Sequence, residues 1–437
     1  MEKAFKNLIK SDFPDLGSAR LLLAVSGGVD SVVLAHLCKK AKLDFSIAHC
    51  NFNLREDESD ADEEFVMELG DALEVEVFSE SFDTAAYAEE AGISIQMAAR
   101  DLRYDWFEDL RGTLKYDFIL TAHHANDDLE TFIINLVRGS GLEGFTGIKA
   151  RNNKIIRPFL TFSRREIEAY ARENHISWRE DSSNASSKYM RNRIRHQVIP
   201  VLEDLNPQLL QSFTLTQEHL QESFDLLEDY VGLLYSEIVS KTEHGYSLKI
   251  NVLQKVPNTR AVLYHLLKTF GFTEWNDVHD LLKAQPGKMV FSATHRLIKD
   301  REYLLLTEKP SETEDRVYEI SEGEEIVMLP PGTFSIEEVE DIGETAPNVL
   351  YVEREKLEFP LVLRKWQEGD LFYPFGMKGK KKISDFFKDK KLSLPEKENT
   401  WLLCSGDRIA WVVNHRADAR FAVTDPSRKI LKITYSL

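Results

Sequence analysis

The chain has 437 residues, of which 43% are hydrophobic and 29% are charged, and its formal net charge is −18. This length suits about three domains at roughly 150 residues each, and the composition is that of a soluble globular protein. No apolar run approaches the length of a membrane span, and residues 1–6 lack the apolar core of a signal peptide. We therefore expect a cytoplasmic protein without a membrane segment.

The acidic balance argues, taken alone, against a nucleic-acid partner, but the charge is unevenly spread. The segment Lys378–Lys391 carries seven lysines against two aspartates, and Lys188–Arg195 is basic as well. A polyanion could therefore dock locally on this acidic chain. The alternative is that these runs are simply solvated faces, as charge runs often are.

The first half of the chain alternates short apolar runs with helical stretches. We expect strands at 21–25, 45–49, 75–78 and 118–122, and helices at 31–41, 61–73, 94–110 and 126–137. Such alternation predicts an α/β fold with right-handed crossovers and a doubly wound parallel sheet. Ligands bind such sheets at the carboxyl ends of strands, where the loops beginning at Ser26, His49 and Thr121 lie.

The second half of the chain predicts a helical middle domain and a small mixed α/β C-terminal domain. A long helix is expected from Asn206-Pro207 toward Ser240, and the acidic stretch 309–315 is the best linker candidate. Shorter helices are expected at 259–270 and 276–283, a strand pair at 289–292 and 296–306, and later strands at 349–352, 361–365, 401–403 and 409–413. We place the three domains at 1–212, 213–310 and 316–437.

The strand-to-helix turn Ser26-Gly27-Gly28-Val29-Asp30-Ser31 predicts a phosphate cradle. Gly27 and Gly28 let the main chain approach an anion, Ser26 and Ser31 add hydroxyl donors, and the following helix N-terminus favours negative charge. No Gly-Lys-Ser/Thr follows, so this is not the nucleoside-triphosphatase loop. Asp30 stands where that loop has its lysine, and an acid beside phosphates predicts a bridging Mg²⁺. An ordinary turn with an Asp near the helix cap is the alternative.

A second group of polar residues runs from Thr121 to Thr131. His123 leaves the strand end, and Asp127 and Glu130 share one face of the next helix. A histidine and two acids beside a phosphate turn could grip a metal, polarise a phosphate or hold a cationic substrate. Helix capping by Asn126 and Asp127, with one histidine buried, is the alternative.

Together these motifs resemble the ATP-pyrophosphatase (PP-loop) enzymes, an adenine nucleotide α-hydrolase-like fold, and within them the tRNA(Ile)-lysidine synthetase family. The resemblance covers nearly the whole chain, and its specificity comes from the order and number of the motifs. Beyond the two groups above, it rests on the segments 48–55, 99–104, 138–142, 157–158, 181–184, 191–195, 369–370 and 374–377.

The resemblance implies a ligase that uses ATP and Mg²⁺. The wobble cytidine of a tRNA(Ile) with the CAU anticodon would attack the α-phosphate of ATP, and free L-lysine would then displace AMP to give lysidine. By family position, Arg103 would neutralise charge on the α-phosphate, and His123 and Asp127 would lie around ATP and the target cytidine. Asp30 and Glu130 are the candidates for gripping lysine. The group that deprotonates the lysine amine is left open.

The resemblance also implies where tRNA binds. Arg191, Arg193 and Arg195 are expected to contact phosphates near the target base, although surface salt bridges are their alternative. The lysines of the C-terminal run, Lys380, Lys381 and Lys382, are expected to hold a remote stem by charge alone. Family precedent favours a homodimer.

Two departures and two rival functions accompany this interpretation. The family commonly has Gln where this chain has Asp128, and His where it has Phe52.

A tRNA thiolase of the same superfamily would need a persulfide or cluster-binding set of cysteines. Cys38, Cys50 and Cys404 are widely spaced and supply neither that arrangement nor a disulfide framework. A non-catalytic tRNA-binding protein would not need Asp30, His123, Asp127 and Glu130 together.

Overall fold

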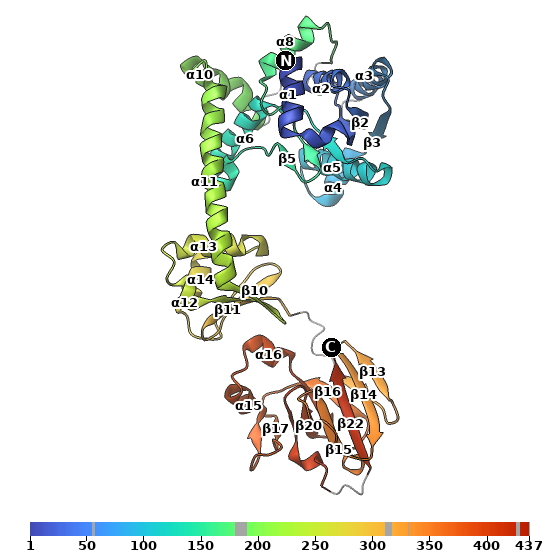
Figure 1. Cartoon of the computed structure of the whole chain (residues 1–437), viewed down its shortest axis with the longest axis vertical. Coiled ribbons are helices and arrows are strands. Elements are labelled where there is room, and N and C mark those ends of the chain that lie inside the picture. Colours follow the sequence, from blue (N-terminus) through green and yellow to red (C-terminus); the bar gives the residue numbers. More distant parts are fainter. Residues whose placement is uncertain (55–56, 180–189, 311–316, 331, 425–428, 437) are drawn as a thin grey trace. The chain divides into compact units, whose positions relative to one another are not determined.

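The structure, a computed structural model of the chain, describes residues 1–54, 57–179, 190–310, 317–330, 332–424 and 429–436. The chain divides into two compact units, Met1–Glu228 and Asp229–Leu437 (Figure 1). The motif segment 181–184 and most of the expected linker at 309–315 lie outside the described residues. The finer three-domain boundaries stay a prediction. Among the described helices, none combines the length and apolar character that crossing a membrane requires.

The first unit is built on a six-stranded sheet in the order β3-β2-β1-β4-β6-β5. Neighbouring strands are parallel except for β5, which pairs antiparallel with β6 at one edge. The predicted α/β fold with a doubly wound parallel sheet is therefore confirmed. The strands are β1 (Arg20–Ala24), β2 (Asp44–Asn51), β3 (Val77–Ser81), β4 (Phe118–Leu120), β5 (Arg151–Asn152) and β6 (Ile155–Ile156).

Helices cover both faces of this sheet. Leu21 and Leu23 of β1 belong to the core that includes α1, α2 and α8, whereas Leu22 points to the opposite face and packs with Phe107 of α5. All three leucines are fully buried, as expected for a strand enclosed on both sides. The helices are α1 (Glu2–Asp12), α2 (Val29–Lys40), α3 (Asp57–Leu73), α4 (Thr84–Ala91), α5 (Ile95–Leu114), α6 (Ala125–Arg138), α7 (Leu142–Phe145), α8 (Arg164–Glu173), α9 (Met190–Arg193) and α10 (Ile199–Leu205).

The strand order reverses between β1 and β4. From β1 the chain moves to β2 and β3 on one side, and it later returns to add β4 and β6 on the other. The loops that follow β1 and β4 therefore leave the sheet in opposite directions, and a crevice opens between them. The fold thus places the Ser26–Ser31 turn and the Thr121–Thr131 segment at one site.

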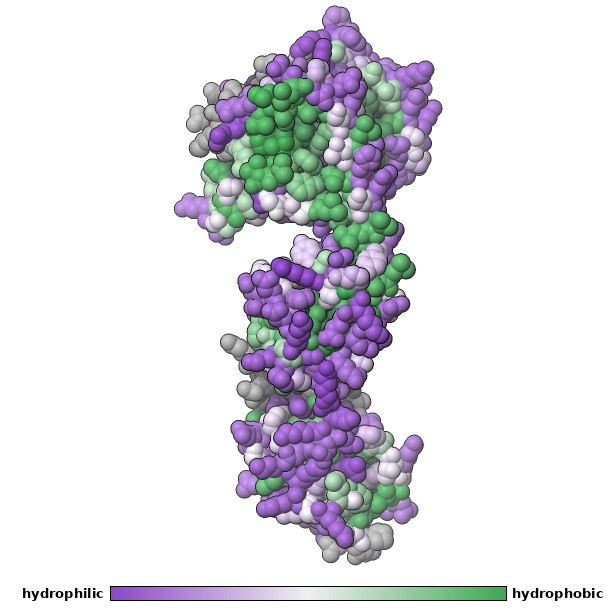
Figure 2. Space-filling view, turned by 90° about the vertical axis from the view of Figure 1, so that its left-hand side faces the viewer, coloured by the Kyte–Doolittle hydropathy of each residue, from purple (hydrophilic) through white to green (hydrophobic). Residues whose placement is uncertain are grey.

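Large apolar side chains are also exposed on the first unit. Figure 2 shows a wide hydrophobic area, drawn in green, on this unit. The exposed apolar side chains of the unit include Leu136 and Val137 at the end of α6, and Val201 and Leu205 of α10. Exposed areas of this kind often mark sites of interaction.

The second unit begins within the long helix α11 (Leu209–Ile238) and continues into a five-stranded antiparallel sheet in the order β7-β8-β11-β10-β9. The observed helix ends close to the predicted position, but the hairpin that follows it was not predicted. The run expected as one strand at 296–306 is split by a turn into β10 and β11. The elements are β7 (Val239–Thr242), β8 (Gly245–Lys249), α12 (Ile250–Leu253), α13 (Thr259–Leu267), α14 (Trp275–Asp280), β9 (Met289–Phe291), β10 (His295–Lys299) and β11 (Tyr303–Glu308).

The C-terminal part of this unit contains two antiparallel sheets, in the orders β12-β16-β19-β20-β21 and β13-β14-β22-β15, and two short helices. The four strands predicted here are all present within a residue or two. The elements are β12 (Tyr318–Ile320), β13 (Ile326–Leu329), β14 (Gly332–Val339), β15 (Val349–Glu353), β16 (Leu361–Lys365), β17 (Leu371–Phe372), β18 (Lys381–Lys382), α15 (Ile383–Asp389), α16 (Leu394–Asn399), β19 (Trp401–Ser405), β20 (Arg408–Val412), β21 (Arg416–Ala417) and β22 (Ile430–Ser436).

Candidate active site

The Ser26–Ser31 turn joins β1 to α2, as the sequence predicts. Gly27 has a φ of +86°, a left-handed conformation that glycine adopts without strain. The Ser31 hydroxyl fixes the turn, because it accepts from the Ser26 N–H at 3.2 Å and donates to the Gly28 carbonyl at 3.0 Å. The first N–H groups of α2 have no acceptor within the helix. The turn is thus held in a shape that presents N–H donors to an anion.

Two adjoining cavities lie at this end of the sheet. Their volumes are about 880 and 380 Å³, which are in the range of small-molecule sites. Arg195 and Arg164 line only the larger cavity, whereas His123 and Arg191 line only the smaller one. Residues from all three predicted loops and from α5 line both cavities: Ser26, Gly28, Asp30, Cys50, Phe52, Arg103 and Asp127.

Asp30 is in the first turn of α2 and faces both cavities. Its Oδ1 is buried and accepts no hydrogen bond, while His124 Nε2 and Arg164 Nη1 lie 3.7 Å from its two carboxylate oxygens. Burial raises the pKa of the Asp30 carboxyl, and His124 and Arg164 oppose that shift. A buried carboxylate oxygen without a donor, beside a phosphate turn, is available to a cation.

This arrangement fits Mg²⁺ bound with substrate phosphates. Among the described residues, no group of three or more His, Cys, Asp or Glu side chains is arranged to enclose a metal. Mg²⁺ needs no such group, because it commonly binds through one or two carboxylates together with phosphate oxygens and water. Asp30 supplies the first kind of ligand, and a nucleotide on the turn would supply the second.

His123 follows β4 and points into the smaller cavity. Its Nδ1 lies 2.9 Å from Thr121 Oγ1. Burial lowers the pKa of His123 to about 4, and the cations Arg157, Arg191 and Arg100 act in the same direction, while Asp127 opposes it. The imidazole is therefore neutral at pH 7, with one donor and one acceptor nitrogen.

His124, which the sequence treated only as a companion of His123, lies between the two acids of the site. Its Nε2 is 3.5 Å from Asp127 Oδ2 and 3.7 Å from Asp30 Oδ1, and the side chain is buried. The pair of adjacent histidines at a strand end is a sequence signal for a site residue, but the sequence does not show which of the two histidines faces which acid. The structure assigns a place in the site to both.

Asp127 lies in the first turn of α6 and combines a capping role with a place in the cleft. One carboxylate oxygen accepts the His124 backbone N–H at 3.1 Å, and the other lies 3.4 Å from Arg195 Nη2. Burial alone would raise the pKa of Asp127, but His124, His123 and the backbone hydrogen bond together lower it. The predicted capping role is therefore present, and the same side chain also lines both cavities, whereas its role in the chemistry stays a prediction.

Glu130 is fully buried one turn further along α6 and does not line either cavity. Arg195 binds it with two contacts, Nε to Oε1 at 2.6 Å and Nη2 to Oε2 at 3.1 Å, and Arg191 Nε lies 3.3 Å from Oε2. Burial raises the pKa of Glu130, and the arginines oppose that shift. In this conformation both carboxylate oxygens are taken by guanidinium groups.

The three predicted RNA-binding arginines therefore differ in position. Arg191 and Arg195 face α6, and Arg191 also donates to Thr131 Oγ1 at 2.7 Å. Arg193, between them in the sequence, is exposed and forms no ion pair with a described residue. The local salt-bridge alternative thus describes Arg191 and Arg195 in this structure, while Arg193 is free for a phosphate.

Arg103 extends from α5 to the border of both cavities. Its guanidinium carbon lies 5.1 Å from the centre of the Phe52 ring, and that ring stacks on Phe82 at 5.9 Å. Among the residues that the structure describes, no carboxylate pairs with Arg103. The phenylalanine at the position where the family commonly has histidine therefore forms the surface on which Arg103 rests.

The lysines of the C-terminal run lie in the second unit. Lys380 and Lys382 are exposed, while Lys381 is half-buried and forms an ion pair with Asp389 of α15. Among the described residues, Lys380 and Lys382 thus form no ion pair, whereas Lys381 is locally paired.

Three family models match the chain. They are described as a PP-loop domain over residues 1–202, a TilS substrate binding domain over 241–309 and a TilS substrate C-terminal domain over 361–433. The first of these contains both cavities of the candidate active site. The order of the three along the chain is the order that the sequence motifs predict.

Curated relatives match nearly the whole chain. The tRNA(Ile)-lysidine synthase of Parabacteroides distasonis is 40% identical over 421 residues, which cover 95% of each chain. The proteins of the same name from Bacteroides thetaiotaomicron and Porphyromonas gingivalis strain W83 are 37% and 36% identical; they cover 94% of this chain and 94% and 93% of their own lengths. The chain therefore belongs to the tRNA(Ile)-lysidine synthase family.

Proposed function

We propose that this chain uses ATP to join free L-lysine to the wobble cytidine of tRNA(Ile) with the CAU anticodon, through an adenylated cytidine. The observation that carries the proposal is a cleft at which three features meet: the phosphate turn, the Asp30 oxygen that accepts no hydrogen bond, and Arg103, which pairs with no carboxylate among the described residues. That cleft lies in a chain whose relatives of this name match it almost from end to end.

In the first step the cytidine oxygen attacks the α-phosphate of ATP, and pyrophosphate leaves. The N–H groups and hydroxyls of Ser26, Gly27, Gly28, Val29, Asp30 and Ser31 would bind the leaving pyrophosphate. Mg²⁺ held by Asp30 would add positive charge there and so stabilise the leaving group. Arg103, which has no carboxylate partner among the described residues, would neutralise the charge that develops on the α-phosphate.

The target cytidine has to leave the stacked anticodon loop to react. His123 and Asp127 would lie around it, as their family positions predict. Because His123 is neutral, its Nε2 can make a directed hydrogen bond to the base without adding charge. Arg193 can reach a neighbouring phosphate directly, whereas Arg191 and Arg195 would bind RNA while remaining in contact with α6.

In the second step the lysine amine attacks the activated ring carbon, and AMP leaves. Asp30 lies in the cleft and can bind the ammonium group of the incoming lysine. Glu130 stays a candidate for the same role, but lysine would first have to displace Arg195 or Arg191 from it. The amine must lose a proton before it attacks, because its pKa near 10.4 keeps it charged at neutral pH.

The remaining predicted partners also belong to this proposal. Lys380, Lys381 and Lys382 would hold a remote tRNA stem through its phosphates. A homodimer remains a prediction, for which size-exclusion chromatography with light scattering is the direct measurement.

The test is incubation of the protein with ATP, radiolabelled lysine and tRNA(Ile) carrying the CAU anticodon. We expect label in the RNA, with AMP and pyrophosphate formed in equal amounts. A tRNA thiolase would incorporate sulfur, and a non-catalytic binding protein would consume no ATP. The half-buried Cys50, whose pKa is raised to about 12 by desolvation, is a poor nucleophile and so argues against the thiolase. Absence of ATP-dependent lysine incorporation would refute the proposal.

A further inference from the structure

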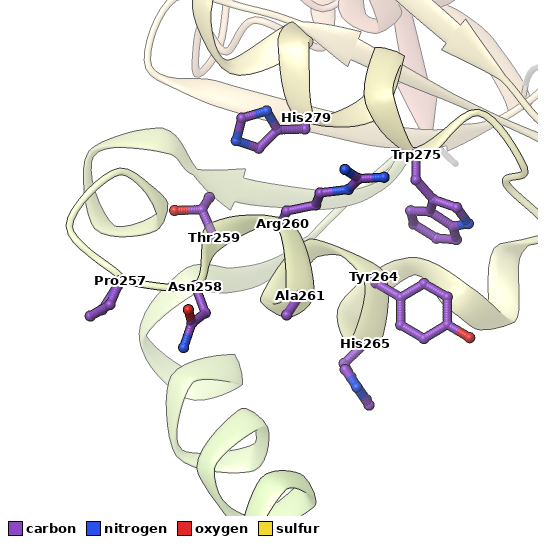
Figure 3. Close-up of a pocket in the computed structure, with 9 residues that line it drawn as sticks. All are labelled: Pro257, Asn258, Thr259, Arg260, Ala261, Tyr264, His265, Trp275 and His279. Carbon is purple, nitrogen blue, oxygen red and sulfur yellow. The ribbon is translucent and has the colours of Figure 1, made fainter. Parts of the chain in front are cut away.

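A groove with no role in the proposed chemistry lies in the second unit, between α13 and α14 (Figure 3). Its volume is about 660 Å³, which is in the range of ligand sites. The groove is lined by Pro257, Asn258, Thr259, Arg260, Ala261, Tyr264, His265, Trp275 and His279.

Two aromatic rings form one side of this groove. Tyr264 of α13 and Trp275 of α14 meet edge to face, with ring centres 4.8 Å apart and an angle of 64° between the ring planes. Tyr264 keeps 42% of its surface exposed, and Trp275 is half-buried. A fixed aromatic pair that remains open to solvent is suited to stacking against a planar ligand.

The charge of the groove is positive, although the chain as a whole is strongly acidic. No Asp or Glu side chain lines it. Arg260 is exposed, forms no ion pair with any residue in the described part of the chain, and extends toward Trp275 (Figure 3). His279 Nδ1 lies 3.6 Å from Asp280 Oδ1, so that acid pairs with the histidine.

We propose that this groove is a binding subsite for one nucleotide of the tRNA substrate. The base stacks on the exposed ring of Tyr264, against which Trp275 packs edge to face, and the phosphate binds Arg260, a combination that proteins use for unpaired RNA nucleotides. The proposal rests on the proposed function, since tRNA is the RNA that the enzyme binds. The groove lies within residues 241–309, which match the family model described as a TilS substrate binding domain.

The contribution of the Arg260 charge is tested by direct measurement of tRNA binding to the full-length protein. The measurement is made in the absence of ATP and lysine, over a series of salt concentrations. Arg260→Ala should weaken binding about tenfold and lower the slope of log K against log salt by about one. Lys288→Ala, which removes an exposed cation of the same unit outside the groove, is the matched control and should have a smaller effect. Equal effects of the two substitutions would overturn the proposal, because the groove would then add only general charge.

The stacking surface is tested by a second pair of variants. Tyr264→Ala should weaken tRNA binding about tenfold, whereas Tyr264→Phe, which keeps the ring, should bind as the wild type does. Thermal unfolding of both variants verifies that the unit remains folded. Wild-type affinity in a folded Tyr264→Ala protein would contradict the proposal. Because the assay needs no chemistry, failure of the lysine ligation would leave this binding test intact, and the two results are distinguishable.

Discussion

Asp30 lies in the first turn of α2, where N–H groups attract anions, yet its own Oδ1 is buried and accepts no hydrogen bond. Such a group costs stability at neutral pH, because burial disfavours the ionised form and the raised pKa records that cost. A carboxylate that is unfavourable for folding and faces a phosphate turn is best explained by a cation that arrives with the nucleotide.

Replacement of Asp30 should therefore separate stability from activity. We expect Asp30→Ala to lower the rate of pyrophosphate formation by about a hundredfold or more, because the charge that stabilises the leaving group is lost. Its melting temperature should equal or exceed that of the wild type, because the variant no longer desolvates a carboxylate whose contacts with His124 and Arg164 are long, at 3.7 Å. A wild-type rate in this variant would refute the assignment of Asp30 as metal ligand.

The contact of Arg103 with Phe52 provides a second prediction for a single residue. Phe52→Leu removes the ring beneath the guanidinium, and an exposed cation–π contact contributes about 0.5–1 kcal/mol. We expect kcat/KM for ATP to fall about two- to fivefold in Phe52→Leu and to remain near wild type in Phe52→Tyr. An equal loss in both variants would show that Phe52 does not act through its ring.

At the scale of elements, α6 connects the site to the rest of the first unit. Its N-terminal end carries Asp127 and Glu130 toward the arginines, and Asp128 points the other way, where it accepts the Ile148 N–H at 2.6 Å. Burial raises the pKa of Asp128, and the hydrogen bond from the Ile148 N–H and the nearby Gln217 side chain of α11 oppose that shift. The acid found where the family commonly has Gln thus joins three segments of the fold.

The packing around Asp128 predicts that replacement of Gly147 lowers the stability of the fold. Its φ is +81°, and an added Cβ would lie 2.0 Å from Gln217 Nε2 and 2.7 Å from Asp128 Oδ1. We expect Gly147→Ala to lower the free energy of unfolding by about 1–3 kcal/mol, as measured by denaturant titration. Gly141→Ala is the control, because Gly141 has a negative φ and no atom within 4 Å of an added Cβ. Similar losses in the two variants would contradict this account.

The three arginines Arg191, Arg193 and Arg195 do not all face the same element. Residues four apart share a helix face, so Arg191 and Arg195 both reach α6 while Arg193 points elsewhere. The sequence treats the three as one basic motif. Helical spacing could have separated Arg193 from the other two, but nothing local shows that Glu130, more than 60 residues away, is their partner.

For the whole molecule, the features that could be predicted are those that local patterns determine. Alternating apolar runs predict the doubly wound sheet, and that topology places the loops at Ser26, His49 and Thr121 in one cleft. Contacts between distant segments could not be predicted. The burial of Glu130, the place of His124 between two acids and the stacking of Arg103 on Phe52 all arise from tertiary packing.

In the second unit, too, only the elements with strong local patterns could be predicted from the sequence. Its predicted strands carry strong apolar runs, whereas β7 and β8 have half-polar sequences and follow a long helix, so periodicity extends the helix to their start. The groove between α13 and α14 was not predicted either, because Arg260, Tyr264 and Trp275 form no motif along the chain.

The basic run of the second unit predicts a salt-dependent contribution to tRNA binding. Lys382→Ala removes an exposed cation and should lower the slope of log K against log salt by about one. Lys381→Ala should change the slope less, because Asp389 already pairs with that ammonium group. Filter binding over a range of salt concentrations measures both. Unchanged slopes in both variants would exclude this run from the phosphate contacts.

In the proposed reaction the cleft activates the cytidine of the tRNA, with release of pyrophosphate, before lysine takes part. Exchange of labelled pyrophosphate into ATP, measured without lysine, tests this order most directly. The account predicts exchange that requires tRNA(Ile) with the CAU anticodon and is lost in Asp30→Ala. Exchange that requires lysine and proceeds without tRNA would contradict it, because lysine and not the cytidine would then be the adenylated substrate.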